Sequence, residues 1–181
     1  YYENVKIMSP AVLDGDGKLM SLTDCLRERE QFFANQQIKM MIGKGSTETI
    51  DAHDLERAQD NIQKDFIFTG IAEYFDASIL LLSRIIRWHP CAYGKLNSGT
   101  SKKRLKGKDR STLRRINYLE NVLYENARDN LLAEMRSAGG KFDAALAELS
   151  KFTAEATKNG QHAAHALSGN HTAIKIFMND A

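Results

Sequence analysis

Apolar residues along the chain recur mainly at helical spacing, which predicts a protein built largely of helices. Ser21 is placed to cap a first helix, and the apolar positions within residues 32–41 continue the helical pattern until Gly43. Asp51 then starts a polar amphipathic helix that extends through Ile62. We therefore expect the N-terminal part of the chain to consist of helices joined by turns.

The middle of the chain changes from helical to strand character. Residues 65–71 form a β-rich apolar run that predicts a buried strand, and residues 77–88 form an apolar helix that Pro90 ends. A strand that feeds a helix through a short turn is the building block of α/β folds. The pattern therefore predicts an α/β fold with few strands.

The second half begins with a basic stretch that contains glycines, residues 93–108, which predicts a loop. Ser111 is placed to cap a long helix that runs to about residue 138, where Gly139 and Gly140 end it. The Ala-rich tail beyond them has one apolar helical face, made of Phe142, Leu146, Leu149 and Phe152. We expect two parts, one spanning residues 1–138 and a helical tail at residues 139–181.

The composition is that of an ordinary globular protein, with 181 residues, 43% of them hydrophobic, and 25 basic against 23 acidic residues. A net charge of +2 gives no reason to expect a nucleic-acid partner, so any electrostatic signal must come from local clustering. The longest apolar run, residues 79–86, is too short to span a bilayer and is interrupted by Arg84. No membrane segment is therefore expected in this chain.

The cysteines and histidines give no sign of a metal site. Cys25 and Cys91 are the only cysteines, and the sequence leaves open whether they pair or stay as thiols. His162, His165 and His171 lie close together along the chain, but no neighbouring carboxylate or cysteine completes a ligand set. We therefore expect no metal cofactor.

Three segments carry a more specific pattern. The first is Asn-Gln-Gln at residues 35–37, just before Met-Met-Ile-Gly at residues 40–43. The second is residues 54–58, followed after a short gap by residues 66–82, where Gly-x-x-Glu and an aromatic-Asp-x-Ser group lead into a Leu-rich helix. The third is residues 116–127, with a Leu-Tyr-x-x-Ala core.

In this order the three segments resemble the Golgi-type carbohydrate sulfotransferases and their bacterial relatives, and the resemblance covers roughly residues 1–135. It implies a P-loop-like sulfotransferase fold, represented here mainly by its helix-rich C-terminal part. It also implies transfer of a sulfuryl group from 3'-phosphoadenylyl sulfate (PAPS) to a hydroxyl of a carbohydrate, such as a uronic acid or galactose. The implied partners are a nucleotide donor and a hydroxyl acceptor, with no nucleic acid. A eukaryotic member is expected in the Golgi lumen and a bacterial one in the cytoplasm.

Some motifs of the family have no match in this chain. No Gly/Ser/Thr-rich loop with a Lys follows a strand near the start, although the family uses such a loop to hold the donor's phosphosulfate group. The family's Arg-and-Ser motif for the 3'-phosphate usually precedes a Tyr-Tyr pair, which Tyr1 and Tyr2 resemble. We therefore expect this chain to be the C-terminal half of a sulfotransferase, with the catalytic residues upstream of Tyr1 and no activity in the isolated chain.

The basic stretch contains the candidate donor-binding residues. Residues 96–103 are similar to a Leu-x-x-x-Thr-x-Lys-Lys stretch in the uronyl 2-O-sulfotransferases, where this loop folds over the nucleotide. The resemblance assigns donor binding to Thr100 and Lys103. The basic run of Lys102, Lys103, Arg104, Lys106, Lys108 and Arg110 is a candidate for part of the 3'-phosphate site. Two other interpretations stay open: a solvated basic loop, and a surface for an anionic glycan or a nucleic acid.

The candidate acceptor-binding residues are Asn35, Gln37 and Glu73. Asn35 and Gln37 carry amides that suit sugar hydroxyls, although a polar helix face explains them equally well. Glu73 follows the predicted strand at its carboxyl end, where ligands of α/β folds bind. Its structural interpretation is a cap on the helix that begins near Phe75.

A rival hypothesis from another class is a non-catalytic helical interaction module with an anion-binding basic loop. The module would use the amphipathic helix from Ser111 and the Ala-rich tail for partner contacts. The enzyme hypothesis predicts exposed apolar surface around residues 66–71, because the strands that would pair with them are not in this sequence.

Overall fold

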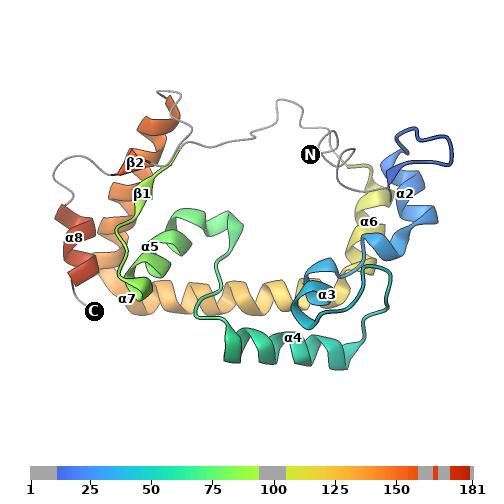
Figure 1. The fold of residues 1–181 in the computed structure, drawn as a ribbon. Coiled ribbons are helices and arrows are strands. Elements are labelled where there is room, and N and C mark those ends of the chain that lie inside the picture. The colour runs from blue at the N-terminus through green and yellow to red at the C-terminus, as the bar shows by residue number, and fades with distance from the viewer. Residues whose placement is uncertain (1–11, 94–104, 159–164, 167–171, 180–181) are drawn as a thin grey trace. The chain divides into compact units, whose positions relative to one another are not determined.

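The computed structural model describes residues 12–93, 105–158, 165–166 and 172–179, and most of their regular structure is helical (Figure 1). The α-helices are α2 (Leu22–Glu28), α3 (Gln36–Ile42), α4 (Ala52–Asp65), α5 (Phe75–Ile86), α6 (Gly107–Ile116), α7 (Tyr118–Lys158) and α8 (Thr172–Asn179). Two 3-10 helices, η2 (Glu30–Phe32) and η3 (Ala72–Tyr74), and two strands, β1 (Cys91–Ala92) and β2 (His165–Ala166), complete the elements. No helix among the described residues is both long and apolar enough to cross a membrane.

The chain forms two compact units. Unit 1 consists of Tyr1–Phe66 and Gly99–Glu125, and unit 2 consists of Ile67–Ser98 and Asn126–Ala181. Helix α7 contributes its first residues to unit 1 and the remainder to unit 2.

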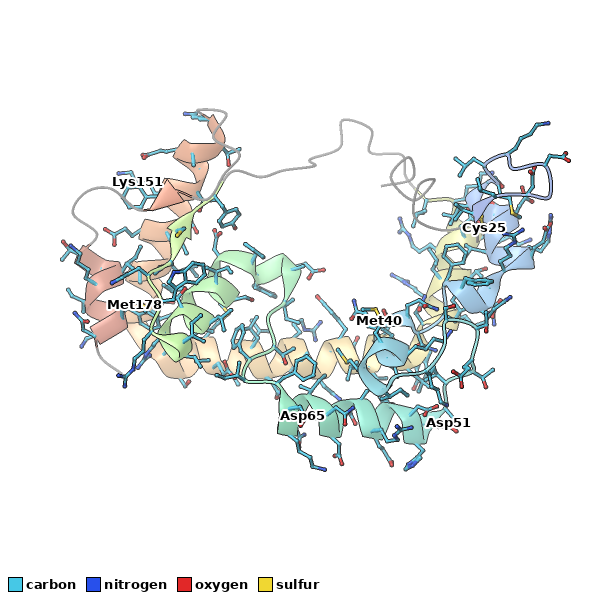
Figure 2. The ribbon with its side chains drawn as sticks, in the orientation of Figure 1. Cys25, Met40, Asp51, Asp65, Lys151 and Met178 are labelled. Carbon is cyan, nitrogen blue, oxygen red and sulfur yellow. The ribbon has the colours of Figure 1, made fainter. Side chains whose placement is uncertain are left out.

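Unit 1 is organised around α3, which packs against α4 (Figure 1). Ile38 of α3, Ala58 of α4 and Leu123 of α7 form a buried apolar cluster. Asp51 caps α4 as predicted, through a reciprocal capping box with Asp54, and Figure 2 shows Asp51 and Asp65 at opposite ends of this helix. The helix predicted within residues 32–41 is confirmed only from Gln36, where α3 begins, because a turn at residues 33–35 separates it from η2. Gly43 ends α3 as predicted, with φ 73°.

Helix α2 joins the other elements of unit 1 through α6. Ser21 caps α2 as predicted, because its hydroxyl accepts a hydrogen bond from the backbone N–H of Asp24. On the same helix the Thr23 hydroxyl donates to the buried Asp109 carboxylate of α6, at 3.0 and 3.1 Å from its two oxygens. This contact fixes which side of α6 faces inward.

The helix predicted from Ser111 has a different start. Helix α6 begins earlier, at Gly107, and Ser111 lies inside it, where its hydroxyl donates to the Gly107 carbonyl. Asn117 then interrupts the run, because its side-chain amide donates to the Leu113 carbonyl at 3.0 Å and its backbone leaves helical geometry at φ −108° and ψ 27°. A new helix, α7, follows, and the predicted break at Gly139 is confirmed there by φ 69° and ψ −165°.

Unit 2 is built on α5, the C-terminal part of α7 and α8. Phe142 of α7 and Phe177 of α8 are buried and meet edge to face, with ring centroids 5.5 Å apart. Arg84 of α5 lies over the Phe177 ring at 4.7 Å. Phe142 and Leu149 are fully buried, which confirms the predicted apolar face of the tail.

The strand predicted at residues 65–71 is wrong. Phe66 and Ile71 have extended backbone angles, but no described residue pairs with this segment, and a strand requires a hydrogen-bonded neighbour. The Ser78 hydroxyl serves instead: it accepts from the Ile71 N–H at 3.0 Å and donates to the Ile71 carbonyl at 3.3 Å. Phe66 and Ile67 are 48% and 72% exposed, as the enzyme hypothesis predicts, but Ile71 at the end of the same segment is 6% exposed.

The strand content of the described residues is therefore small. Strands β1 and β2 form one antiparallel pair, with Cys91 opposite Ala166 and Ala92 opposite His165. Within the described ranges the architecture is helix-rich, as predicted, but the α/β strand-to-helix unit around residue 70 is absent.

Candidate functional site

A pocket of about 310 Å³ lies within unit 1, between the start of α3 and the loop that follows this helix. Most of its lining is polar: Glu30, Gln31, Asn35, Lys39, Thr47, Glu48 and Thr49, together with Ala34 and Ile50. Hydroxyl, amide, carboxylate and ammonium groups therefore surround a volume at the small end of the range for ligand pockets.

Asn35 stands at the entrance to α3 and is buried at 8% exposure. It adopts a left-handed conformation with φ 50°, which Asn tolerates better than most residues. Its backbone N–H donates to the Asn117 side-chain oxygen at 2.7 Å, and its own side-chain oxygen accepts from the Glu120 N–H at 3.1 Å. Within the described part of the chain its Nδ2 makes no hydrogen bond, so this donor is available to a pocket ligand.

Glu120 completes the connection from the other side. Its carboxylate accepts from the backbone N–H of Gln37 in the first turn of α3, at 3.1 Å. Burial raises the pKa of Glu120, while the Gln37 hydrogen bond and the Lys39 charge oppose the shift. Residues more than 80 positions apart in sequence thus cap each other's helices and hold one wall of the pocket.

Lys39 is the most unusual residue of the pocket, because its side chain is 2% exposed. Its ammonium group donates to the carbonyls of Gln31 and Ser46, at 2.8 and 2.7 Å. No carboxylate among the described residues forms an ion pair with it, and burial lowers the pKa of Lys39 below its ordinary value of 10.5. An ammonium with two of its three donors engaged can give the third to a ligand.

The loop of residues 43–50 is fastened to α3 and α4 by several polar contacts. Gln36 donates from its amide to the carbonyls of Gln31 and Ser46, at 3.1 and 3.2 Å. The Lys44 ammonium reaches the buried Asp54 carboxylate at 2.6 Å. The Glu48 carboxylate accepts from the Gly45 N–H. The pocket wall is therefore held in place before any ligand binds.

The structure places the three predicted acceptor residues differently. Asn35 lines the pocket. Gln37 is exposed, and its backbone rather than its side chain makes the Glu120 contact. Glu73 belongs to unit 2, where it is exposed in η3 and makes no hydrogen bond or ion pair within the described ranges. The predicted donor residues Thr100, Lys102, Lys103 and Arg104 lie outside the described residues.

The aromatic-Asp-x-Ser group around α5 has a structural role in unit 2. The Asp76 carboxylate accepts from the Tyr93 hydroxyl and from the Ser150 hydroxyl, the latter at 2.7 Å. Burial and this carboxylate raise the pKa of Tyr93. The Ser78 hydroxyl makes hydrogen bonds with the backbone N–H and carbonyl of Ile71, as a neighbouring strand would. Both motif residues therefore hold α5 in place.

Sequence reasoning missed Lys39, Glu48 and the threonines of the pocket, whose only sequence signal is their proximity to Asn35. Cys25 and Cys91 are free thiols. Among the described residues no group of His, Cys, Asp and Glu is arranged to hold a metal ion.

Comparison with known protein families gives a match over most of the chain. The family model described as galactose-3-O-sulfotransferase matches residues 23–176. The match includes all residues of the pocket, and it continues beyond Gly139 through the tail and into α8. No curated protein and no solved structure matches the chain.

Proposed function

Because this chain belongs to the galactose-3-O-sulfotransferase family, we propose that the protein transfers a sulfuryl group from PAPS to a carbohydrate hydroxyl. The family match carries this proposal, since it spans both compact units. In the reaction the acceptor oxygen forms a new bond to sulfur and the bond between sulfur and the phosphate oxygen breaks. The acceptor proton leaves to a base, and 3'-phosphoadenosine 5'-phosphate is released. The P-loop-like fold and the PAPS donor are part of the same proposal.

The pocket of unit 1 supports an acceptor role. A sugar presents several hydroxyls that both donate and accept, and the lining offers acceptors in Glu30 and Glu48 and donors in Asn35 and Lys39. Ile50 adds an apolar surface against which a sugar ring can lie. The volume of about 310 Å³ has room for a small polar group such as one sugar residue.

We assign the donor's phosphates to Thr100, Lys102, Lys103 and Arg104, on the resemblance of this segment to nucleotide-covering loops of related sulfotransferases. Ammonium and guanidinium groups suit a 3'-phosphate because charge-assisted hydrogen bonds to phosphate are among the strongest in proteins. The threonine hydroxyl adds a neutral donor.

The donor assignment is tested by the affinity of the full-length protein for 3'-phosphoadenosine 5'-phosphate, measured by calorimetry. The double variant Lys102→Ala/Lys103→Ala is expected to bind about 10- to 100-fold more weakly. Lys151→Ala/Lys158→Ala removes the same charge from exposed positions of α7 and serves as the control. Equal affinity in both double variants would remove the assignment.

The acceptor pocket is tested by steady-state kinetics with a galactose-terminated acceptor. Asn35→Asp keeps the oxygen that caps α7 but removes the Nδ2 donor, so we expect the acceptor KM to rise about tenfold with donor affinity unchanged. Gln37→Glu makes the same amide-to-carboxylate change outside the pocket lining. If Asn35→Asp leaves the acceptor KM unchanged, the pocket does not bind the acceptor.

A further inference from the structure

The outer surface of α6 carries an unusual concentration of positive charge. Lys106, Lys108, Arg110 and Arg114, which we call the basic face, are all exposed. Lys106, Arg110 and Arg114 follow one another at four-residue intervals and so line one side of the helix. Ser111 and Gly107, also exposed, lie between them and leave the charged groups uncovered.

No acidic side chain within the described ranges neutralises the basic face. The one acid of α6, Asp109, is turned inward and accepts hydrogen bonds from Thr23. Glu30 pairs with Arg115, at 2.7 Å, at the end of the helix. The four residues of the basic face make no ion pair or side-chain hydrogen bond with described residues.

Helix α4 of the same unit shows the ordinary arrangement. Its Lys64 is paired with Asp60 at 2.8 Å, and its Arg57 lies 3.7 Å from Asp54. Basic residues on α4 are thus balanced along the helix, as expected of a solvated face. The basic face of α6 lacks this balance, although both helices belong to unit 1. Unbalanced charge at this density creates a local positive potential that attracts polyanions.

We propose that the basic face binds a polyanionic, sulfated glycan chain, as an extended acceptor or as the product. The choice of a glycan rests on the proposed function, because an enzyme that sulfates carbohydrate meets chains that already carry sulfate groups. Sulfate oxygens accept hydrogen bonds from Arg and Lys in the same way as phosphate oxygens. The residues of the basic face do not line the pocket, so the basic face would bind a further part of the chain and increase the local concentration of the acceptor.

A soluble glycan fits the basic face better than a lipid surface does. Helices that lie on membranes present apolar side chains beside their basic ones. In α6 the apolar side is turned into unit 1, where Ile116 is buried, and the exposed apolar side chain next to the basic face is Leu105. The outward side of the helix is therefore charged rather than amphipathic.

The experiment measures binding of the full-length protein, without donor, to a fluorescent sulfated dextran oligosaccharide at several salt concentrations. We expect salt-sensitive binding that Arg110→Gln/Arg114→Gln weakens about tenfold and makes less salt-dependent. Arg57→Gln/Lys64→Gln removes the same charge from α4 and is expected to leave affinity within about twofold. Thermal unfolding of both variants shows whether the fold is retained.

The proposal would be overturned by no binding, by equal loss in both double variants, or by equally tight binding to uncharged dextran. Preferential binding to vesicles with anionic lipid over sulfated dextran would also overturn it, since the occupant would be a membrane. Because the measurement needs no PAPS and no turnover, its failure leaves sulfuryl transfer untouched. A protein that binds the glycan but transfers no sulfuryl group would instead contradict the proposed function alone.

Discussion

Asn35 and Glu120 cap each other's helices. The Asn35 side-chain oxygen accepts from the Glu120 N–H in the first turn of α7, and the Glu120 carboxylate accepts from the Gln37 N–H in the first turn of α3. The N-terminal amides of both helices would otherwise lack partners in a partly buried place. This reciprocal contact positions one wall of the unit 1 pocket, which Asn35 lines, and it explains why a polar residue is buried at position 35.

The capping role predicts the effect of replacing Asn35. Asn35→Gly accepts the left-handed backbone at φ 50° but removes the oxygen that accepts from the Glu120 N–H, so we expect a loss of about 1 kcal/mol in the free energy of unfolding. Asn35→Asp retains an acceptor for the Glu120 N–H and is expected to lose less. Urea denaturation measures both, and a larger loss for Asn35→Asp would contradict the capping role.

Lys39 and Gln36 share their hydrogen-bond acceptors, so we expect their substitutions to have non-additive effects on the free energy of unfolding. Both side chains donate to the same two carbonyls, those of Gln31 and Ser46. Lys39→Met leaves Gln36 to serve both carbonyls and removes a buried charge, so we expect a change under about 1 kcal/mol. The double variant Gln36→Ala/Lys39→Met leaves both carbonyls without a side-chain donor and is expected to lose at least about 1 kcal/mol more than the sum of the single changes. Additive losses would show that the two side chains act independently.

The Asp54 carboxylate is expected to contribute to the loss of stability of unit 1 at low pH. The hydrogen bond from Lys44 holds the pKa of Asp54 below its ordinary value of 3.8. The folded state therefore favours the ionised carboxylate. The resulting stabilisation is complete above about pH 3.8 and is lost as the pH falls through the lowered pKa. Asp54→Asn is expected to flatten the decline in unfolding free energy between neutral pH and pH 3, measured by urea denaturation. An unchanged decline would contradict the Lys44 contact.

Replacing Ser78 is expected to lower the stability of unit 2. Its hydroxyl is buried and accepts from the Ile71 N–H, so Ser78→Ala leaves that N–H without a partner and is expected to cost about 1–3 kcal/mol. Ser137→Ala, at an exposed position of α7 where the hydroxyl bonds within its own helix, should change stability by under about 0.5 kcal/mol. Similar values from thermal unfolding of the two variants would mean that Ser78 does not support the Ile71 backbone.

Local sequence signals predicted the helix boundaries set by Ser21, Gly43, Asp51 and Gly139, because each acts through its own backbone or its nearest neighbours. The burial of the residue at position 39 could not be predicted from such local signals. The apolar pattern within residues 32–41 includes Met40 and excludes Lys39, yet Met40 is 81% exposed and Lys39 is buried. The Lys39 ammonium donates to the carbonyls of Gln31 and Ser46, which belong to separate segments. These carbonyls come together only after the loop of residues 43–50 has folded back toward α3.

The same limit explains the wrong strand. Residues 66–71 have the β propensity of a strand, and Phe66 and Ile71 have extended backbone angles, but a ladder also requires a neighbouring strand, which propensity does not reveal. The start of α6 at Gly107 was missed because Ser111 carries the stronger capping signal, although it bonds within the helix. The division at residue 138 and the donor-binding segment 100–104 stay predictions.

The most direct test of the account is transfer of labelled sulfate from PAPS to galactose-terminated oligosaccharides by the full-length protein, with Asn35→Asp and Gln37→Glu measured beside it. We expect label on the sugar, release of 3'-phosphoadenosine 5'-phosphate in equal amount, and a raised acceptor KM in Asn35→Asp alone. Absence of label on any hydroxyl acceptor, in a protein that is folded and binds the nucleotide, would contradict it and favour a non-catalytic interaction module.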